Sequence, residues 1–161
     1  LAPAMMKAGF GRIINIASNA GVSGYGYSSA YCAAKHAMVG MTRALAIDLA
    51  RTGVFQNLGG SFGGVFAHLA FVIDLARTGV TINALCPGWV ETQMAEEAVT
   101  RIASKTGRTV DEARNSLAAM SPQRRMITPD EVAHAALMLC PHEARGIHGQ
   151  TIVIDGGAVM K

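Results

Sequence analysis

Three short runs of branched apolar residues limit what this chain can fold into more than any other feature. They are RIINIAS at 12–18, VTINALCPGW at 80–89 and QTIVIDGG at 150–157. The first run lacks apolar–polar alternation, which is typical of a strand buried on both faces. Helical patterns lie between the runs. The order strand, helix, strand, helix, strand predicts right-handed parallel crossovers, and therefore an α/β fold with a doubly wound parallel sheet.

The segment after the first run predicts a loop and then a long helix. Residues 19–29 are polar and glycine-bearing, whereas from Ala30 the chain is rich in Ala, Met and Leu. This composition predicts a helix over 30–50, with Gly53 as its C-terminal cap. The helix has small and apolar residues around much of its circumference.

Two further helical regions follow the second run. Residues 91–120 are polar and amphipathic, and they predict helical pieces interrupted at the sequence KTGRT. The segment 128–140 carries a strong helix start. Thr128 is placed to cap, Pro129 suits the first turn, and Glu131 completes a capping box.

One octapeptide occurs twice. IDLARTGV is found at 47–54 and again at 73–80, identical at all eight positions. Nothing else recurs at this period, so a solenoid repeat is a poor explanation. An insertion over 55–80 with a flanking duplication fits better, within a single α/β domain over 1–161. It would join a helix C-terminus to a strand N-terminus, at the edge opposite the ligand crevice of a doubly wound sheet.

Composition argues against several function classes. The 161 residues carry a formal net charge of +3, with scattered Lys and Arg and few aromatics, which predicts no nucleic-acid partner. The stretches 13–34 and 52–73 contain no charged residue, but glycines and polar residues interrupt both. No membrane span is therefore expected, no signal peptide is visible, and the predicted location is cytoplasmic.

Cysteine and histidine spacing predicts neither a disulfide framework nor a metal site. Cys32, Cys86 and Cys140 show no CxxC spacing, and the five histidines show no paired spacing. The cysteines are expected to be small core residues in a reducing compartment, and no metal is expected.

A tyrosine and a lysine stand four positions apart where the long helix begins. Tyr31 and Lys35 would project from the same helical face. An ammonium beside a phenol favours the phenolate, which would supply a proton donor and acceptor usable near neutral pH. Ser18 ends the first strand and would face the same crevice. Together the three residues could handle a proton on an alcohol or a carbonyl, although a YxxxK pair alone is common on helix surfaces.

With these residues in view, the sequence resembles the short-chain dehydrogenase/reductase family. The resemblance rests on GRIINIAS, the Ser18, Tyr31 and Lys35 spacing, GQTIVIDGG, and the stretch from YCAAKHAM to CPGWVETQM with the insertion skipped. It covers the chain except 55–80 and implies the C-terminal half of a Rossmann-like doubly wound sheet. The implied reaction is hydride transfer between NAD or NADP and a carbonyl compound, or its reverse.

The resemblance also implies roles for single residues. Tyr31 would be the general acid/base, and Ser18 would orient the substrate carbonyl. Lys35 would assist the tyrosine and bind the nicotinamide ribose hydroxyls, to which Tyr31 would also lie close. The residues expected to line the nicotinamide are Pro87, Gly88, Val90 and Thr92.

The family's nucleotide-binding half has no counterpart in this sequence. LGGSFGGVF at 58–66 is rich in glycine but lacks the GxxxGxG spacing, and no convincing strand precedes it. The adenosine contacts and the choice between NAD and NADP therefore cannot be assigned. The flank of the sheet that this half would cover is expected to expose a strand edge and apolar surface.

Within the family, the sequence resembles 3-oxoacyl thioester reductases, polyketide ketoreductases and 3-hydroxybutyrate dehydrogenases. The last group carries a histidine where this chain has Ala20 and a lysine where it has Ser28. Since two polar anchors for a small carboxylate are absent, an acyl thioester or a less polar ketone is favoured.

Several residues near the expected site have two interpretations. Trp89 would wall the substrate pocket or pack in the core. Met94, a substrate contact in the first interpretation, would belong with 95–120 to a lid or to a solvated amphipathic helix pair. Tyr25 and Tyr27 would reach the pocket or remain loop aromatics. The basic doublet Arg124 and Arg125 would meet a coenzyme A phosphate or simply be solvated.

Two hypotheses of different classes follow. The first is an NAD(P)-dependent oxidoreductase that interconverts a ketone and a secondary alcohol, a 3-oxoacyl or 3-hydroxyacyl compound. The second is an inactive remnant that acts only by association with other subunits. By the resemblance, the long helix and the C-terminal strand would form the interfaces of a homo-oligomer, a dimer or a tetramer.

Overall fold

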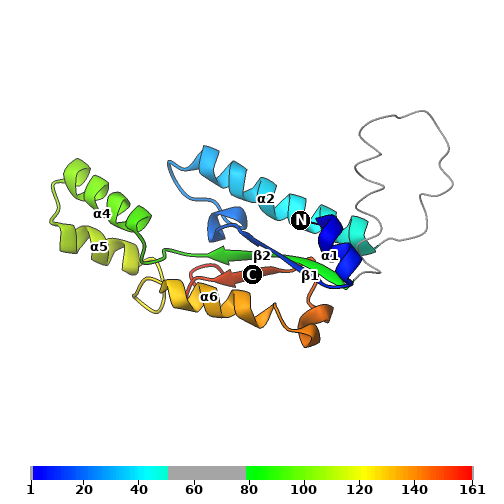
Figure 1. Ribbon diagram of the computed structural model, residues 1–161. Coiled ribbons are helices and arrows are strands. Elements are labelled where there is room, and N and C mark those ends of the chain that lie inside the picture. Colours follow the sequence, from blue (N-terminus) through cyan, green and yellow to red (C-terminus); the bar gives the residue numbers. More distant parts are fainter. Residues whose placement is uncertain (1, 51–78, 161) are drawn as a thin grey trace, which may run out of the picture.

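The computed structural model describes residues 2–50 and 79–160, and its centre is a parallel sheet of three strands (Figure 1). The strands are β1 (Gly11–Ile16), β2 (Val80–Pro87) and β3 (Thr151–Ile154), in the order β1-β2-β3. The β1–β2 register runs from Gly11 opposite Val80 to Ile16 opposite Leu85, and Ala84 lies opposite Thr151 in the β2–β3 pair. All three predicted strands and the α/β class are confirmed.

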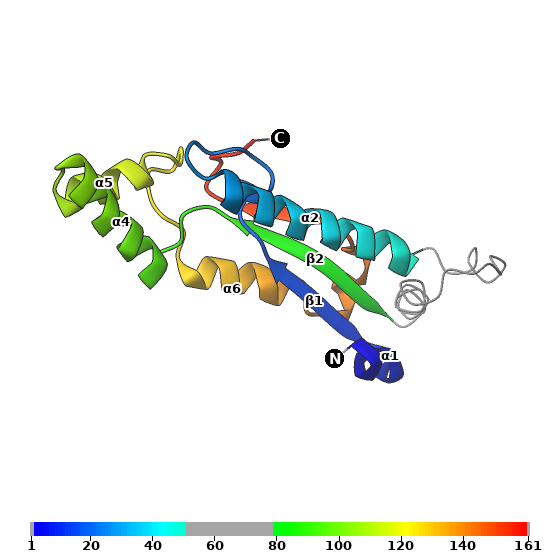
Figure 2. The same cartoon turned by 90° about the horizontal axis from the view of Figure 1, so that it is seen from above.

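Helices cover both faces of the sheet. α2 (Ser29–Ala50) lies along one face and α6 (Pro129–Met138) along the other (Figures 1 and 2). Every residue of β2 is buried, as expected of a central strand between two layers. One group of buried side chains joins α2 to the amino end of β2 and another joins it to the carboxyl end: Ala46, Val80 and Ile82, then Ala17, Val39 and Cys86.

Short elements complete the layers. α1 (Ala2–Ala8) precedes and contacts β1, the 3₁₀ turn η1 (Asn19–Gly21) follows β1, and a second 3₁₀ turn, η4 (His142–Gly146), precedes β3. Among the described strands β1 pairs only with β2. The side chain of Ile16 is half exposed there. The expected open edge of the sheet is therefore present in the described part of the chain.

Beyond the carboxyl end of β2, two helices form a small unit of their own (Figure 1). α4 (Gln93–Thr106) ends at Gly107, whose φ of 70° is the left-handed conformation that favours glycine. α5 (Val110–Ala118) begins with a capping box made by Thr109 and Glu112. The predicted break at KTGRT is thus confirmed. The unit has its own apolar core: Ala95, Val99, Ala113, Leu117 and Met126.

The start of α6 is built as its sequence predicts. The Thr128 hydroxyl accepts from the Glu131 backbone N–H at 3.3 Å, and the Glu131 carboxylate accepts from the Thr128 N–H at 2.8 Å. Pro129 occupies the first turn. The guanidinium of Arg125 also donates to both Glu131 oxygens, at 2.7 and 2.6 Å. These bonds hold the loop before α6 against its first turn.

Arg12 links loops at the amino end of the strands by hydrogen bonds. Its guanidinium donates to the carbonyls of Gly79 at 2.8 Å and Pro141 at 2.9 Å. α2 ends and β2 begins at this end of the strands, away from their carboxyl ends. Residues 51–78 lie outside the described part, so most of the proposed insertion 55–80 and the Gly53 cap stay predictions.

The cysteine prediction needs one correction. Cys86 is buried and Cys32 is half-buried, but Cys140 is exposed, because it follows the last turn of α6 on the solvent side. All three are free thiols. Within residues 2–50 and 79–160, no cluster of His, Cys, Asp or Glu could hold a metal ion, and no helix has the length and apolarity to cross a membrane.

Candidate active site

The carboxyl ends of the three strands meet the N-terminus of α2, and the predicted catalytic residues lie there. Ser18 follows β1 directly and caps η1. Its hydroxyl accepts from the Ala20 backbone N–H at 3.1 Å and lies 3.5 Å from the Asn19 side-chain oxygen Oδ1, to which it donates. Ser18 is buried, so its hydroxyl is held on both its donor and its acceptor side.

Tyr31 and Lys35 occupy the first turns of α2. The Tyr31 side chain is 48% exposed. The Lys35 ammonium nitrogen Nζ lies 5.7 Å from the centre of the Tyr31 ring. It donates to the Ile16 carbonyl at 3.1 Å. Because Ile16 is two residues before Ser18, this bond ties the lysine to the end of β1. Tyr31 and Lys35 therefore share one face of α2, as their spacing predicts.

Gly21 lets the loop of Ser18 approach α2 closely. A Cβ atom at Gly21 would lie 2.7 Å from the Lys35 carbonyl oxygen and 3.1 Å from a methyl group of Val39. Real Cβ atoms essentially never approach within 3.0 Å, so the contact requires glycine. The structure thus brings Ser18, Tyr31 and Lys35 to one corner of the fold.

A buried carboxylate joins the ends of the strands. Asp155, directly after β3, is 5% exposed and accepts from the Asn19 side-chain nitrogen Nδ2 at 3.3 Å. It also accepts from three backbone N–H groups that follow it, those of Gly157, Ala158 and Val159. At the end of β2, a Cβ on Gly88 would lie 2.8 Å from that of Asp155. The three strand ends are therefore packed around one side chain.

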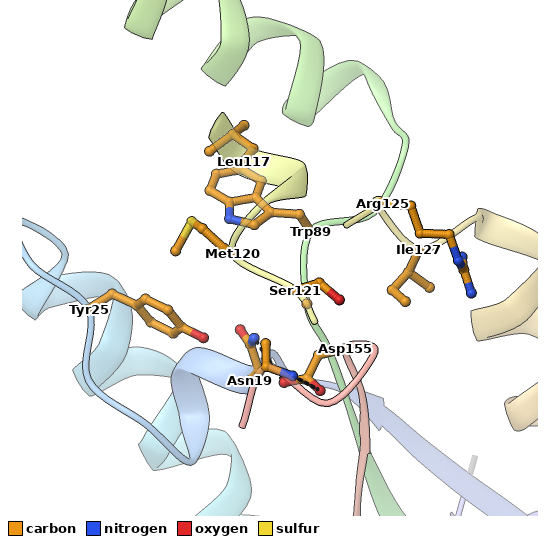
Figure 3. Close-up of a pocket in the computed structure, with 11 residues that line it drawn as sticks. Asn19, Tyr25, Trp89, Leu117, Met120, Ser121, Arg125, Ile127 and Asp155 are labelled. Atoms are coloured by element: carbon orange, nitrogen blue, oxygen red, sulfur yellow. Dashed lines mark hydrogen bonds between the residues drawn. The ribbon is translucent and has the colours of Figure 1, made fainter. Parts of the chain in front are cut away.

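A cavity of about 70 Å³ opens beside this carboxylate (Figure 3). Asn19 and Asp155 lie at one side, the Tyr25 hydroxyl points toward Asn19, and the Trp89 ring lies near Leu117 (Figure 3). The remaining lining residues are Gly88, Met120, Ser121, Arg125, Ile127 and Ala158. Apolar and aromatic side chains thus share the wall with the polar side chains of Asn19, Ser121, Arg125 and Asp155.

The cavity adjoins the three predicted catalytic residues rather than containing them. Ser18, Tyr31 and Lys35 are not among its lining residues, but Asn19 both lines it and bonds to Ser18. Burial raises the pKa of the Tyr25 phenol, and the nearby Asp155 charge raises this pKa further. Tyr25 therefore stays neutral at physiological pH and can donate a hydrogen bond into the cavity.

The residues predicted to line a nicotinamide lie at the end of β2 and directly after it. Pro87 is buried, the Gly88 N–H donates to the Ile154 carbonyl at 3.0 Å, and Val90 forms an isolated bridge with Ile127. The Thr92 hydroxyl donates to the Val90 carbonyl at 3.3 Å. Although Thr92 is the N-cap of α4, its side chain makes no capping bond, so its oxygen can accept a hydrogen bond from a ligand while its proton is donated to Val90.

Other predicted contacts lie outside the cavity. Met94 is 71% exposed on α4 and is not a lining residue, so its contact with substrate stays a prediction. Tyr27 is fully exposed with a φ of 60°. Arg124, with a φ of 53°, is also exposed. Arg125 lines the cavity but is paired with Glu131, which the solvated-doublet interpretation did not include.

Sequence reasoning missed two residues of this site. Asn19 was assigned only to a loop, and Asp155 only to the glycine exit of the last strand. A polar residue beside Ser18 and an aspartate before two glycines were the available signals. Neither signal indicates a partner, because the two residues are 136 positions apart.

Comparisons with known proteins agree with this geometry. Residues 68–159 match a family described as enoyl-(acyl carrier protein) reductase, and residues 1–58 match one described as short chain dehydrogenase. A parallel α/β sheet with these matches defines an oxidoreductase-type fold. The chain belongs to the short-chain dehydrogenase/reductase family.

Individual relatives show how much of the family fold is present. A D-beta-hydroxybutyrate dehydrogenase from Cupriavidus necator is 35% identical over 99% of this chain and 52% of its own length. The crystal structure of an actinorhodin polyketide ketoreductase with NADPH matches with a TM-score of 0.75 and 33% identity, covering 96% of this chain and 49% of that one. A sorbitol-6-phosphate 2-dehydrogenase from Erwinia amylovora matches with a TM-score of 0.77 and 28% identity, covering 99% and 53%. The chain spans about half the length of the curated relatives it matches.

Proposed function

We propose that this chain is the catalytic half of an NAD(P)-dependent oxidoreductase that interconverts a ketone and a secondary alcohol. The observation that supports the proposal is that Lys35, whose ammonium lies over the Tyr31 ring, donates to the Ile16 carbonyl two residues before Ser18. A phenol, an ammonium and a hydroxyl at one place supply what proton transfer to a substrate oxygen needs. Family membership supports the hydride-transfer part of the reaction.

Each residue has a separate task in this mechanism. In reduction, the Tyr31 hydroxyl gives its proton to the carbonyl oxygen as that oxygen becomes an alcohol, and in oxidation it takes the proton back. Ser18 donates a hydrogen bond to the same oxygen and holds it near Tyr31. The Lys35 ammonium stabilises the tyrosinate that forms when the proton leaves.

The residues at the end of β2 and directly after it would hold the nicotinamide end of the nucleotide. The Thr92 hydroxyl has no capping role to compete with a ligand, and Lys35 has two N–H donors beyond the one bonded to Ile16. Bound NAD(P)H supplies the hydride for the carbonyl carbon. Pro87, Gly88, Val90 and Thr92 would hold its nicotinamide, and Tyr31 with Lys35 its ribose.

The cavity supports a neutral acyl substrate, a 3-oxoacyl or 3-hydroxyacyl compound. Its lining includes Trp89, Leu117 and Ile127, Asp155 places a negative charge at one side, and the guanidinium of Arg125 is paired with Glu131. Ala20 and Ser28 provide no cation for a free carboxylate. A thioester or ketone would therefore bind better than a hydroxybutyrate anion, with Trp89 as a wall of the pocket. Met94 would contact the substrate as part of a lid.

Two tyrosine variants test the mechanism. The chain is assayed for NADPH- and NADH-dependent reduction of an acetoacetyl thioester, with Tyr31→Phe as the test and Tyr27→Phe as its matched control. Tyr27 is fully exposed, so its hydroxyl removal should leave the rate unchanged. Loss of the acid/base should lower kcat by about 100-fold or more. Equal activity of the two variants would exclude Tyr31 as the proton donor.

A second function has its own supporting observation. The chain spans about half of its relatives, and within residues 2–50 and 79–160 β1 pairs only with β2, so the chain could act only by association with other subunits. A folded chain that binds neither NADH nor NADPH in a fluorescence titration would favour this function. Light scattering of the purified chain tests the related prediction that it forms a homodimer or homotetramer.

A further inference from the structure

Asp155 has more hydrogen-bond partners than the end of a strand requires. Its oxygen Oδ1 accepts from the backbone N–H groups of Gly157 and Ala158, at 3.0 and 3.1 Å. Its oxygen Oδ2 accepts from the Val159 N–H at 3.0 Å and from the Asn19 side chain at 3.3 Å. Three of these bonds close the turn after β3. The fourth reaches across the sheet to the residue next to Ser18.

The carboxylate decides which way the Asn19 amide points. A carboxylate only accepts hydrogen bonds, so Asn19 must present its Nδ2 donor to Asp155. The Asn19 oxygen Oδ1 then faces the other way, where the Ser18 hydroxyl lies at 3.5 Å. The reverse orientation of the amide would set two acceptors against each other and remove the acceptor beside Ser18. The orientation of Asn19 thus follows from a residue on a different strand.

We propose that Asn19 and Asp155 are positioning residues that hold the Ser18 hydroxyl ready for the substrate oxygen. The Ala20 N–H donates to the Ser18 oxygen, and the Asn19 oxygen Oδ1 accepts a hydrogen bond from the Ser18 hydroxyl until a substrate arrives. The Ser18 proton then turns from Asn19 to the substrate oxygen, and no covalent bond changes in this step. The inference rests on the proposed function, because it assigns Ser18 a hydrogen bond to that oxygen.

Burial and packing explain why this arrangement stays in place. Asn19 and Asp155 are 8% and 5% exposed, so water competes little for their bond. Gly88 packs against both, because a Cβ there would lie 2.8 Å from the Asp155 Cβ and 3.5 Å from the Asn19 nitrogen. The turn bonds to residues 157–159 fix the carboxylate independently of Asn19. Removing Asn19 therefore leaves Asp155 held.

The kinetic test uses three variants of the full chain. Asn19→Ala removes the acceptor beside Ser18 and keeps the turn after β3, and Asp155→Asn removes the charge. Asp130→Asn, at an exposed position in the first turn of α6, is the matched control. We expect kcat to fall about tenfold in the first two variants, with KM within about twofold, because an orienting hydrogen bond to a charged group is lost. The double variant should be no worse than the singles, since both act through one path.

A second measurement does not depend on activity. Nuclear magnetic resonance of the Asn19 side-chain amide reports its bond to Asp155, and Asp155→Asn should shift this signal and speed its hydrogen exchange. Asp130→Asn should change neither. If the unaltered chain reduces no ketone, the proposed function fails while this measurement still decides the orientation of Asn19. The inference is overturned if Asp155→Asn leaves the position and the hydrogen exchange of the Asn19 amide signal unchanged. It is also overturned if Asn19→Ala keeps full kcat in an active chain.

Discussion

The contact between Gly21 and α2 offers a sharp test of how the site is assembled. In Gly21→Ala, the new Cβ would start 2.7 Å from the Lys35 carbonyl oxygen, 3.0 Å from the carbonyl carbon and 3.1 Å from a Val39 methyl group. Two of the three atoms belong to the helix backbone, which cannot rotate away. The loop of Ser18 and the first turns of α2 must therefore separate by at least 0.7 Å to reach ordinary contact at 3.4 Å.

The cost follows from this overlap. Forcing an extra carbon into a packed contact destabilises a protein by about 1 to 3 kcal/mol. For a domain of this size that corresponds to a fall in Tm of roughly 2 to 12 °C. The same shift lengthens the 3.1 Å bond between Lys35 and the Ile16 carbonyl, since the helix moves relative to β1. Stability and the position of Lys35 should therefore change together.

The assay is thermal unfolding followed by circular dichroism, together with NADPH titration by fluorescence. Gly24→Ala is the matched control, because a Cβ at Gly24 meets no atom within 4 Å and should change stability by less than about 0.5 kcal/mol. We expect Gly21→Ala to melt earlier and to bind nucleotide more weakly than the control. Equal Tm and equal binding would show that α2 yields freely at this contact, and the reasoning would be wrong.

Two other predictions concern the ends of α6 and α2. The Arg125 guanidinium and the Thr128 N–H lower the pKa of Glu131 to about 2, so the stability from this carboxylate is present above its ordinary value of 4.5 and is lost as pH falls through about 2. Acid titrations of stability should thus be less steep between pH 4.5 and 2 in Glu131→Gln than in the unaltered chain, and parallel curves would contradict this. The second prediction concerns a deletion of residues 55–80. In this variant Gly53 and Val54 directly precede Thr81, where Gly79 and Val80 stand in the unaltered chain. Because the dipeptide is the same, the circular dichroism spectrum and the cooperative thermal unfolding should persist. Loss of cooperative unfolding would contradict the insertion hypothesis.

The local part of the fold was predictable from the sequence. The sequence predicts the strands at 12–18, 80–89 and 150–157 in place, although the structure ends each of them two or three residues earlier. The capping box at Thr128 and the break before Thr109 were also expected or implied. These features depend on residues within a few positions of each other, so a single sequence displays them.

The candidate site was predictable only in part. The spacing of Tyr31 and Lys35 indicates a shared helical face because a helix turns regularly. The Lys35 bond to Ile16 and the tight approach at Gly21 depend on how α2 lies on the sheet, and no local pattern reports that. The exposed position of Cys140 was predicted wrongly for a related reason, since composition does not say which face of an element meets solvent.

The sequence by itself determined the element order, the helix caps and the residue types available for proton transfer, because backbone preference and apolar periodicity act over short distances along the chain. The tertiary structure alone decided that Asn19 meets Asp155 and that Arg125 lies between the cavity and Glu131. Those contacts arise where strand register and the paths of three loops bring distant segments together. Parallel pairing places the carboxyl ends of β1, β2 and β3 side by side. The buried carboxylate of Asp155 then accepts hydrogen bonds from the donors that lie next to it, because buried polar groups are hydrogen-bonded.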